Sequence, residues 1–534
     1  MKSSFKLIVA LFLFALSSQA QPANFSIAIE PYSIPGLGGL QAFAKAQSQG
    51  KWLIVGGRLD GLHRRQPWAT FDVAGNNNQL LVVDPINQLE WSSPLTSLPV
   101  SIQEQLQSTN MEFYQEGDYL YLVGGYGFSA TAGDHITYPN LTSIKVSDVI
   151  LGIINNTSIT PYFRQIVDQD LAITGGYMNK IYDDFYITGG QRFDGRYNPM
   201  NNPTFTQTYT NAIRRFQIID NGINLSINTI SVTIDSLELH RRDYNVVPQI
   251  MPNGEQGLTA FSGVFLPTVD LPYTNCVNID SNGYSVNNNF TQLYNQYHCA
   301  HIPLYSLINN EMHTLFFGGI AQYYDSLGIM VQDNNVPFVK TIAMVTRDSN
   351  GLMVENKLPV ELPDYFGASS EFFVNTIIST FSNEVIQLDS LNADTNLLGY
   401  IFGGIKSSAP NIFWINDGTQ SIASETLFKV YLIKNTTSIA LEPGTIQGLN
   451  LNIFPNPNNG TFQLSFDLKN ASEVAISITD VLGRSVFEVP SKYFSAGKNK
   501  ISGEIKNTND NQLYIVTLKT KDSTTIRKFI VHQE

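Results

Sequence analysis

The stretch Tyr119-Leu120-Tyr121-Leu122-Val123-Gly124-Gly125 joins an apolar run of strand length to a glycine pair. The pattern returns four more times, with a degenerate copy ending in Ser262-Gly263, and its second glycines are spaced 56 to 85 residues apart. The other true pairs are Gly56-Gly57, Gly189-Gly190, Gly318-Gly319 and Gly403-Gly404. Aromatic and β-branched runs favour strands, and glycine permits backbone conformations closed to other residues where a strand ends. The repeat therefore predicts six similar β units.

The composition agrees with an all-β chain. Charged residues make up only 14% of the 534 residues, whereas aromatic residues reach 11%. This mixture favours short strands joined by polar turns over long helices with many ion pairs. The length allows more than one domain.

The glycine-pair repeat resembles the kelch β-propeller, in which the second strand of each blade ends in Gly-Gly. The resemblance implies a six-bladed kelch-like β-propeller over residues 21–433, although the spacing exceeds the kelch norm of about 50 residues. Only one strand, at residues 427–433, follows the last glycine pair, and residues 25–29 form an unmatched strand at the other end. We expect these two strands to pair, because this closes the ring without an exposed sheet edge.

The C-terminal segment carries three motifs in order. They are Pro455-Asn456-Pro457 with Gly460, then Asp480 with Gly483-Arg484, then a closing pair of strand-like runs at residues 513–518 and 527–531. This segment resembles the type A C-terminal sorting domain of proteins exported by the type IX secretion system of Bacteroidetes. The resemblance implies a small antiparallel β-sandwich at residues 449–534, a linker at 434–448, and the type IX secretion machinery as a partner.

The N-terminus agrees with export. Lys2 and Lys6 precede an apolar run at residues 7–16 that is too short to span a bilayer, and Ser18-Gln19-Ala20 is typical of a cleavage site. We predict a signal peptide at residues 1–20 and no transmembrane segment in the mature chain. The expected location is secreted or on the outer cell surface, reached through the periplasm.

The charge distribution bears on partners. The formal net charge is -13, and residues 450–534 hold 10 Lys/Arg against 8 Asp/Glu, so the acidic excess lies in the main domain. An acidic surface repels phosphate backbones, which argues against a nucleic-acid partner. Neutral glycans and divalent cations are compatible with it.

Basic residues gather in loops that a propeller would place around its central channel. They are Arg58, His63, Arg64, Arg65, Arg192, Arg196, His240, Arg241 and Arg242. Arginines that converge from several blades can bind a carboxylate or sulfate with two parallel hydrogen bonds, and a His-Arg-Arg triplet occurs twice. Alternatively, each arginine bonds to loop carbonyls or to a neighbouring carboxylate. The sequence leaves both interpretations open.

The two cysteines, Cys276 and Cys299, have two possible roles. An oxidising envelope permits a disulfide between them, which we predict, and the alternative is two buried free thiols. His298 and His301 lie nearby, but no paired Cys-x-x-Cys framework supports a metal site, and no metal or cofactor is assigned.

The sequence contains no G-x-S-x-G, H-E-x-x-H or P-loop motif, so no catalytic residue is assigned. We interpret the protein as an exported propeller that binds a glycan or a protein ligand. A carbohydrate-active propeller enzyme of oxidase or epimerase type is one alternative. A structural component of the cell surface or matrix is another.

Overall fold

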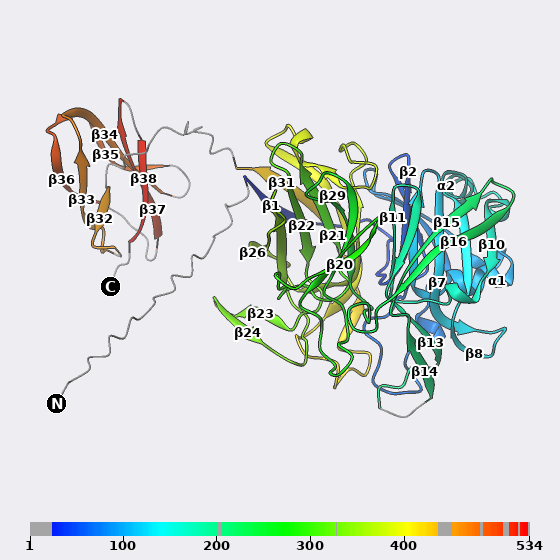
Figure 1. Ribbon diagram of the computed structural model, residues 1–534. Coiled ribbons are helices and arrows are strands. Elements are labelled where there is room, and N and C mark those ends of the chain that lie inside the picture. Colours follow the sequence, from blue (N-terminus) through cyan, green and yellow to red (C-terminus); the bar gives the residue numbers. More distant parts are fainter. Residues whose placement is uncertain are drawn as a thin grey trace, which may run out of the picture. The chain divides into compact units, whose positions relative to one another are not determined.

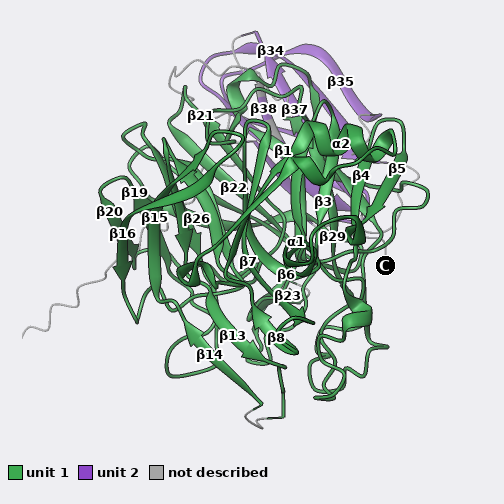
Figure 2. Cartoon of the chain, turned by 90° about the vertical axis from the view of Figure 1, so that its right-hand side faces the viewer, with its two compact units in different colours: residues 1–436 green, residues 437–534 purple. Residues whose placement is uncertain are grey.

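The protein is described by a computed structural model covering residues 24–200, 204–326, 328–435, 451–456, 458–480, 484–505, 512–521 and 524–531. The chain divides into two compact units, residues 1–436 and 437–534 (Figure 2). The predicted signal peptide at 1–20, most of the predicted linker at 434–448, and Pro457 and Gly483 of the sorting motif lie outside the described residues.

The described part of the first unit forms six sheets of four or five strands, and almost all strand pairs are antiparallel (Figure 1). The first three sheets contain β2 (Ala44–Ser48), β3 (Lys51–Val55), β4 (Gln79–Asp84) and β5 (Leu89–Pro94); β6 (Thr109–Glu116), β7 (Tyr119–Ser129), β8 (Asp134–Thr137), β9 (Asn140–Lys145) and β10 (Phe163–Val167); and β11 (Tyr177–Ile181), β12 (Asp184–Thr188), β15 (Ala212–Asp220) and β16 (Leu225–Ile234). The all-β prediction is confirmed.

The last three sheets continue in chain order. They contain β17 (Asn245–Ile250), β18 (Gln256–Phe261), β19 (Cys276–Asp280) and β20 (Gly283–Asn287); β21 (His301–Ser306), β22 (Glu311–Phe317), β25 (Thr341–Arg347), β26 (Met353–Glu361) and β28 (Ile386–Gln387); and β27 (Tyr365–Val374), β29 (Thr395–Ser407), β30 (Ser421–Ala423), β31 (Leu427–Lys434) and β1 (Phe25–Tyr32). Strand β1 pairs with β31 antiparallel, with Ile27 opposite Leu432, which confirms the predicted pairing of the N-terminal strand with the last sheet.

The six sheets are joined at their first strands by a closed circuit of backbone hydrogen bonds. Each bond runs from the N–H of one residue to the carbonyl of the corresponding residue in a neighbouring sheet, at 2.8 to 3.3 Å. In order, the donor and acceptor pairs are Asn110 to Ala42, Gly175 to Asn110, Asp243 to Gly175, His298 to Asp243, Ser369 to His298 and Ala42 to Ser369. We call these six residues the inner ring. The last bond returns to the first sheet, so every sheet is held by two others.

The glycine pairs form a second set of bonds between sheets. The N–H of Gly125, for example, donates to the carbonyl of Ile173 in the next sheet at 3.0 Å, and the second glycine of each other true pair makes an equivalent bond. Both glycines have positive φ, and a Cβ on Gly124 would lie 1.8 Å from the Ile173 carbonyl oxygen. Glycine is required at these positions because the backbone of the neighbouring sheet occupies the space that a side chain would need.

The connections that follow the glycine pairs are long and carry most of the extra elements. They include β8 and the two ribbons β13 (Gln191–Gly195) with β14 (Phe205–Tyr209) and β23 (Tyr323–Ser326) with β24 (Ile329–Gln332). All these elements lie on the lower side of the first unit in Figure 1. We call this side the insertion face. Two short α-helices, α1 (Val100–Leu106) and α2 (Val146–Ile154), pack with β-strands in the core between the first two sheets.

The predicted disulfide is absent, and this prediction is wrong. Cys276 and Cys299 are both buried free thiols in one apolar cluster with Phe261 and Phe316. The Cys276 sulfur lies 3.9 Å from the Met353 sulfur. Each cysteine therefore fills core volume, and burial raises the pKa of both thiols to about 12.

The second unit consists of two antiparallel sheets that share one core. The strands are β32 (Asn452–Phe454), β33 (Thr461–Leu468) and β36 (Gly497–Glu504) in one sheet, and β35 (Ser485–Phe494), β34 (Ser472–Asp480), β37 (Gln512–Thr520) and β38 (Thr524–Val531) in the other. In β34, buried side chains alternate with partly exposed ones, as the period-two pattern predicts.

One carboxyl group is enclosed between the second and third sheets of the first unit. Glu112 on β6 is only 2% exposed. Its Oε1 accepts a hydrogen bond from the Gly176 N–H at 2.8 Å. Burial raises the pKa of Glu112 from 4.5 to about 8. The group is therefore protonated at neutral pH and links two sheets without a buried charge.

We predict that Gly124→Ala strongly destabilises the first unit, whereas Gly117→Ala does not. Both glycines have positive φ, which costs alanine about 1–2 kcal/mol, but nothing lies within 4 Å of a Cβ on Gly117. A Cβ on Gly124 must also displace the Ile173 carbonyl. Chemical denaturation should give a much lower unfolding free energy for Gly124→Ala than for Gly117→Ala. Equal losses would show that the contact between sheets does not require glycine.

We also predict that Glu112→Gln reduces the loss of stability at high pH. The folded pKa of Glu112 lies above its unfolded value, so its stabilisation is complete below about pH 4.5 and is lost as the pH rises through about 8. Between pH 7 and 9 this ionisation should cost the wild type about 1 kcal/mol, and glutamine avoids it.

Denaturation of wild type and Glu112→Gln at pH 7 and pH 9 tests this prediction. Glu104→Gln is the control, because hydrogen bonds from Ser129 and Thr131 outweigh burial and lower the pKa of Glu104. That variant should lose stability at both pH values without a change in the difference between them. The same pH difference in wild type and Glu112→Gln would contradict the assignment.

Candidate functional site

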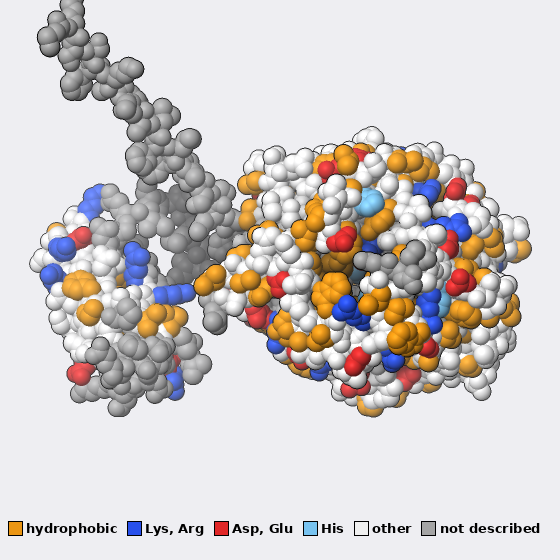
Figure 3. All heavy atoms as spheres, turned by 90° about the horizontal axis from the view of Figure 1, so that it is seen from below, with side chains coloured by type: hydrophobic (Ala, Val, Ile, Leu, Met, Phe, Trp, Pro, Cys, Tyr) orange, Lys and Arg blue, Asp and Glu red, His pale blue; other side chains and the backbone are white. Residues whose placement is uncertain are grey.

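A cavity lies at the level of the inner ring. Its volume is only about 30 Å³, and it opens to solvent. Five inner-ring residues line it, together with side chains that follow them on the first strands, among them Phe113 and Tyr177. Figure 3 views the first unit from the insertion face and shows a hollow near its middle, with Lys and Arg side chains beside it. The cavity and this face form the candidate site.

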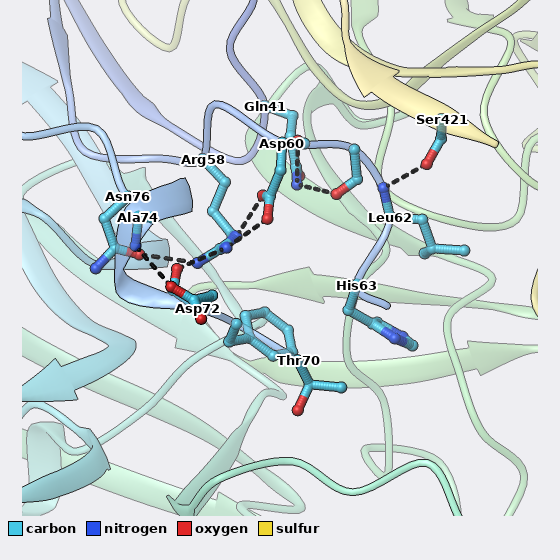
Figure 4. Close-up of polar contacts among 12 residues, drawn as sticks. Gln41, Arg58, Asp60, Leu62, His63, Thr70, Asp72, Ala74, Asn76 and Ser421 are labelled. Carbon is cyan, nitrogen blue, oxygen red and sulfur yellow. Dashed lines mark hydrogen bonds and ion pairs between the residues drawn. The ribbon is translucent and has the colours of Figure 1, made fainter. Parts of the chain in front are cut away.

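Two of the predicted binding arginines are structural. Arg58 is buried and holds both carboxylate oxygens of Asp60 at 2.6 Å, while a third nitrogen donates to Asn76 Oδ1 at 2.8 Å (Figure 4). Arg241 is also buried, and its guanidinium donates to the Ser262 carbonyl at 2.5 Å and to Asn275 Oδ1 at 2.6 Å. Their hydrogen-bonding capacity is used within the fold, so neither is placed to bind a ligand.

Three further arginines of the predicted set have carboxylate partners. Arg192 binds Asp194 at 2.7 Å, and an Arg196 nitrogen lies 3.7 Å from an Asp72 oxygen. Arg242 pairs with Asp243 and donates to the Tyr209 hydroxyl at 2.9 Å. These pairs neutralise most of the positive charge that the sequence places on this face.

The two predicted histidines lie among aromatic rings. The His63 ring makes an edge contact with Tyr197, at 4.9 Å between ring centres, and its buried Nδ1 has no hydrogen-bond partner. Burial, with the charge of Arg242 as a further cause, lowers the pKa of His63 to about 4, so the ring is neutral at pH 7. His240 stacks on Tyr209 at 3.7 Å and bonds Asn211 Oδ1 through Nδ1 at 2.8 Å.

Arg64 and Arg65 differ from the other five arginines of the predicted set because neither forms an ion pair with a described carboxylate. The Arg65 guanidinium lies 5.0 Å from the centre of the Trp414 ring and donates to the Trp414 carbonyl at 2.5 Å. Arg64 is exposed and packs close to Gly418. Arg65 and Arg242 therefore have different partners, and they do not contact each other directly.

Two exposed tryptophans accompany these arginines on the insertion face. Trp68 is 74% exposed and Trp414 is 64% exposed. Their loops are tied together, since the Arg65 N–H donates to the Asn416 carbonyl at 2.9 Å and the Asn416 amide donates to the His63 carbonyl at 3.0 Å. We call Arg64, Arg65, Trp68 and Trp414 the tryptophan rim. Sequence reasoning missed both tryptophans, although their place in polar, glycine-containing loops was a usable signal.

A second group that the sequence did not suggest lies deeper, on the first strands. It comprises Lys45, Tyr177, His301 and Glu371, with the inner-ring residue His298. Here His298 Nε2 lies 2.9 Å from Glu371 Oε1, and the Tyr177 ring lies 5.7 Å from the His298 ring and 5.8 Å from the His301 ring. The described residues contain no group of three or more His, Cys, Asp or Glu side chains that could hold a metal ion.

The described sorting-motif residues of the second unit stabilise its turns. Asp480 is buried and accepts from the Arg484 N–H at 3.0 Å and from Arg484 Nε at 2.7 Å. Asn456 Oδ1 accepts from the Ile530 N–H at 2.9 Å, which ties the Pro455-Asn456 turn to the last strand. The Gly460 N–H donates to Asn458 Oδ1 at 2.9 Å. These contacts explain the polar and glycine positions of the motif by local folding.

No helix among the described residues is long and apolar enough to cross a membrane. No curated protein matches the chain significantly. The solved structures that align with the chain share little sequence with it. "Structure of YjhT" is 10% identical, covering 75% of this chain and 99% of that chain with a TM-score of 0.41. A sucrose-6-phosphate hydrolase from Lactobacillus gasseri is 7% identical, covering 93% and 85% with a TM-score of 0.26. At these TM-scores the similarities support no conclusion about the fold or the function of this chain.

A family model does match the second unit. Residues 452–532 match the family described as "Secretion system C-terminal sorting domain". The matched residues span both sheets of the unit, from β32 to β38. The chain therefore ends in a type IX secretion C-terminal sorting domain, which indicates export to the cell surface or the extracellular space.

Proposed function

We propose that the first unit is a six-bladed kelch-like propeller and that the exported protein binds an acidic glycan on its insertion face. Six sheets in chain order, a closed inner ring of hydrogen bonds and the pairing of β1 with β31 support the propeller. Propellers use the loops around one end of the central channel for binding. The insertion face supplies these loops.

The tryptophan rim carries the proposal for the ligand. Two tryptophan rings are exposed on this face, and tryptophan is enriched at binding sites because it offers a large flat contact area. The faces of sugar rings can stack on them. Arg65 lies over the Trp414 ring, and Arg64 precedes it in the same loop. Neither has a carboxylate partner among the described residues, so a carboxylate or sulfate on the glycan can pair with them.

The remaining arginines argue for a neutral or weakly charged surface around the rim. Arg192, Arg196 and Arg242 each lie near a carboxylate, so they attract anions less than an arginine without one. The positive charge available to a ligand is therefore concentrated at the rim. Acidic sugars on a chain that stacks along Trp414 fit this arrangement better than a fully anionic polymer does.

We predict that Trp414→Ala and Arg65→Ala each weaken binding of an acidic glycan at least tenfold, equivalent to about 1.4 kcal/mol. A glycan array with the mature chain selects the ligand, and calorimetry on the best acidic hit compares the variants. Binding should also weaken at high salt, because exposed ion pairs are screened.

Two control variants have similar side chains outside the rim. Tyr182→Ala removes an exposed aromatic ring from the β11–β12 turn, at the opposite end of its sheet from Gly189-Gly190, and Arg192→Ala removes an exposed arginine that is paired with Asp194. Both should bind the glycan as the wild type does. The proposal is wrong if the array shows no acidic ligand, or if the controls weaken binding as much as the rim variants do.

We predict that a chain ending at residue 448 keeps a folded first unit but accumulates in the periplasm. The sorting domain forms a compact unit with its own core, so its removal leaves the sheets of the first unit intact. Fractionation of the producing cells, with circular dichroism on the purified truncation, measures both effects. Release of the truncated chain at the level of the full chain would contradict a sorting role.

A further inference from the structure

The outermost strand of the third sheet has an unpaired edge. Strand β16 pairs with β15 on one side, and no other strand of the described residues pairs with its outer side. The strand is ten residues long, and eight of these residues are exposed, namely Ser226, Asn228 and all of Thr229–Ile234. The backbone N–H and carbonyl groups on its outer side are therefore open to a further strand.

The sequence of β16 distinguishes it from the other long outer strands of the first unit. Proteins protect exposed sheet edges with charged residues and proline. Strand β1 contains Glu30 and Pro31. Strand β26 contains Lys357 and Pro359. In contrast, β16 reads Leu-Ser-Ile-Asn-Thr-Ile-Ser-Val-Thr-Ile and contains neither a charged residue nor proline. The longest outer strand thus lacks the residues that prevent pairing with another strand.

The second sheet covers only the first half of β16. Leu225 and Ile227 pack in the apolar cluster between the second and third sheets. Toward the other end of the strand, Ile230, Val232 and Ile234 are 43%, 42% and 70% exposed. The neighbouring outer strand, β10, lies beside β16 but has only five residues (Figure 1). The second half of β16 therefore exposes apolar side chains as well as its backbone edge.

An arginine without a partner lies beside this exposed half. Arg214 on β15 is the register partner of Val232, so the two side chains lie on the same face of the sheet. The Arg214 guanidinium forms no hydrogen bond or ion pair with the described residues, and its Nε is buried. By comparison, Arg164 on β10 binds Asp220 at 2.6 Å. A buried donor without an acceptor is unfavourable, and a carboxylate is the strongest acceptor for a guanidinium.

We propose that the exposed half of β16, Thr229–Ile234, binds an extended segment of another protein as an added strand. Backbone hydrogen bonds to the free edge would hold the segment, and its apolar side chains at alternate positions would cover Val232 and Ile234. A carboxylate on the same face would pair with Arg214, whose backbone lies two strand spacings, about 10 Å, from the added strand. A second copy of this chain fits less well, because it brings another unpaired Arg214 and an acidic first unit.

Fluorescence anisotropy on the mature chain with the labelled synthetic peptide Ser-Val-Thr-Glu-Thr-Val-Ser tests the proposal. The two valines and the glutamate of this peptide fall on one face of an extended strand. The chain should bind it at least tenfold more tightly than the same peptide with lysine in place of glutamate. A peptide methylated at its inner backbone nitrogens keeps the side chains but loses the donors for strand pairing, and it should also bind at least tenfold more weakly.

Variants of the chain locate the site. Val232→Glu supplies a carboxylate next to Arg214, so it should weaken peptide binding at least tenfold without lowering the melting temperature. Arg214→Glu should reverse the preference, so that the lysine peptide binds more tightly than the glutamate peptide. Ile86→Glu is the matched control, because it adds the same charge at the β4–β5 turn, where Ile86 is 76% exposed. This control and Trp414→Ala should both bind the glutamate peptide as the wild type does.

The proposal is overturned if the folded mature chain does not bind the glutamate peptide, or if the methylated peptide binds equally well. Full affinity in both Val232→Glu and Arg214→Glu would also overturn it. Sedimentation of the wild type without peptide tests the second copy as the occupant. A dimer that Val232→Glu converts to a monomer would show that β16 pairs with another copy of this chain, and the assignment to a different protein would then be wrong.

Discussion

The first unit depends on the closed circuit of backbone hydrogen bonds at the inner ring. Each ring residue both donates to and accepts from a neighbouring sheet, so the circuit fixes the position of all six first strands. The geometry is demanding, because Ala42, Asn110, Asp243 and Ser369 all have φ near +50° to +60°. Asparagine and aspartate tolerate this region, but alanine and serine do so at a cost. The bonds between sheets offset that cost. At the second strands, the glycine pairs likewise combine positive φ with backbone hydrogen bonds between sheets.

This arrangement explains how an acidic unit tolerates so many arginines in its loops. The long connections of the insertion face cannot be stabilised by strand ladders alone, and Arg58 and Arg241 bridge several loop carbonyls and carboxylates at once. A planar guanidinium with five donors suits this task. Most arginines in these loops therefore stabilise the loop structure. The candidates for ligand binding are the arginines that have no carboxylate partner. Within the predicted set, Arg64 and Arg65 are the two arginines without an ion pair to a described carboxylate.

The sequence predicted repeating features well and single contacts poorly. The glycine pairs and the unmatched strand at residues 25–29 specify backbone conditions that a few residue types satisfy, so the six β units and the β1–β31 pairing could be inferred. The disulfide failed because two cysteines in one apolar cluster need not approach in a bonding geometry. Lys45, Tyr177 and Glu371 were missed for another reason. They are far apart in sequence, and only the inner ring brings their strands together.

The uneven spacing of the glycine pairs reflects insertions at the two ends of the sheets. The longest interval, 85 residues, separates Gly319 from Gly404, and it contains both the β23–β24 ribbon and the insertion at residues 375–394 that connects β27 to β29. Insertions after the glycine pairs enlarge the insertion face, whereas this insertion follows a first strand and therefore emerges at the opposite end of its sheet. Since the inner ring holds every sheet at a fixed place, extra chain can be added at either end without disturbing the core.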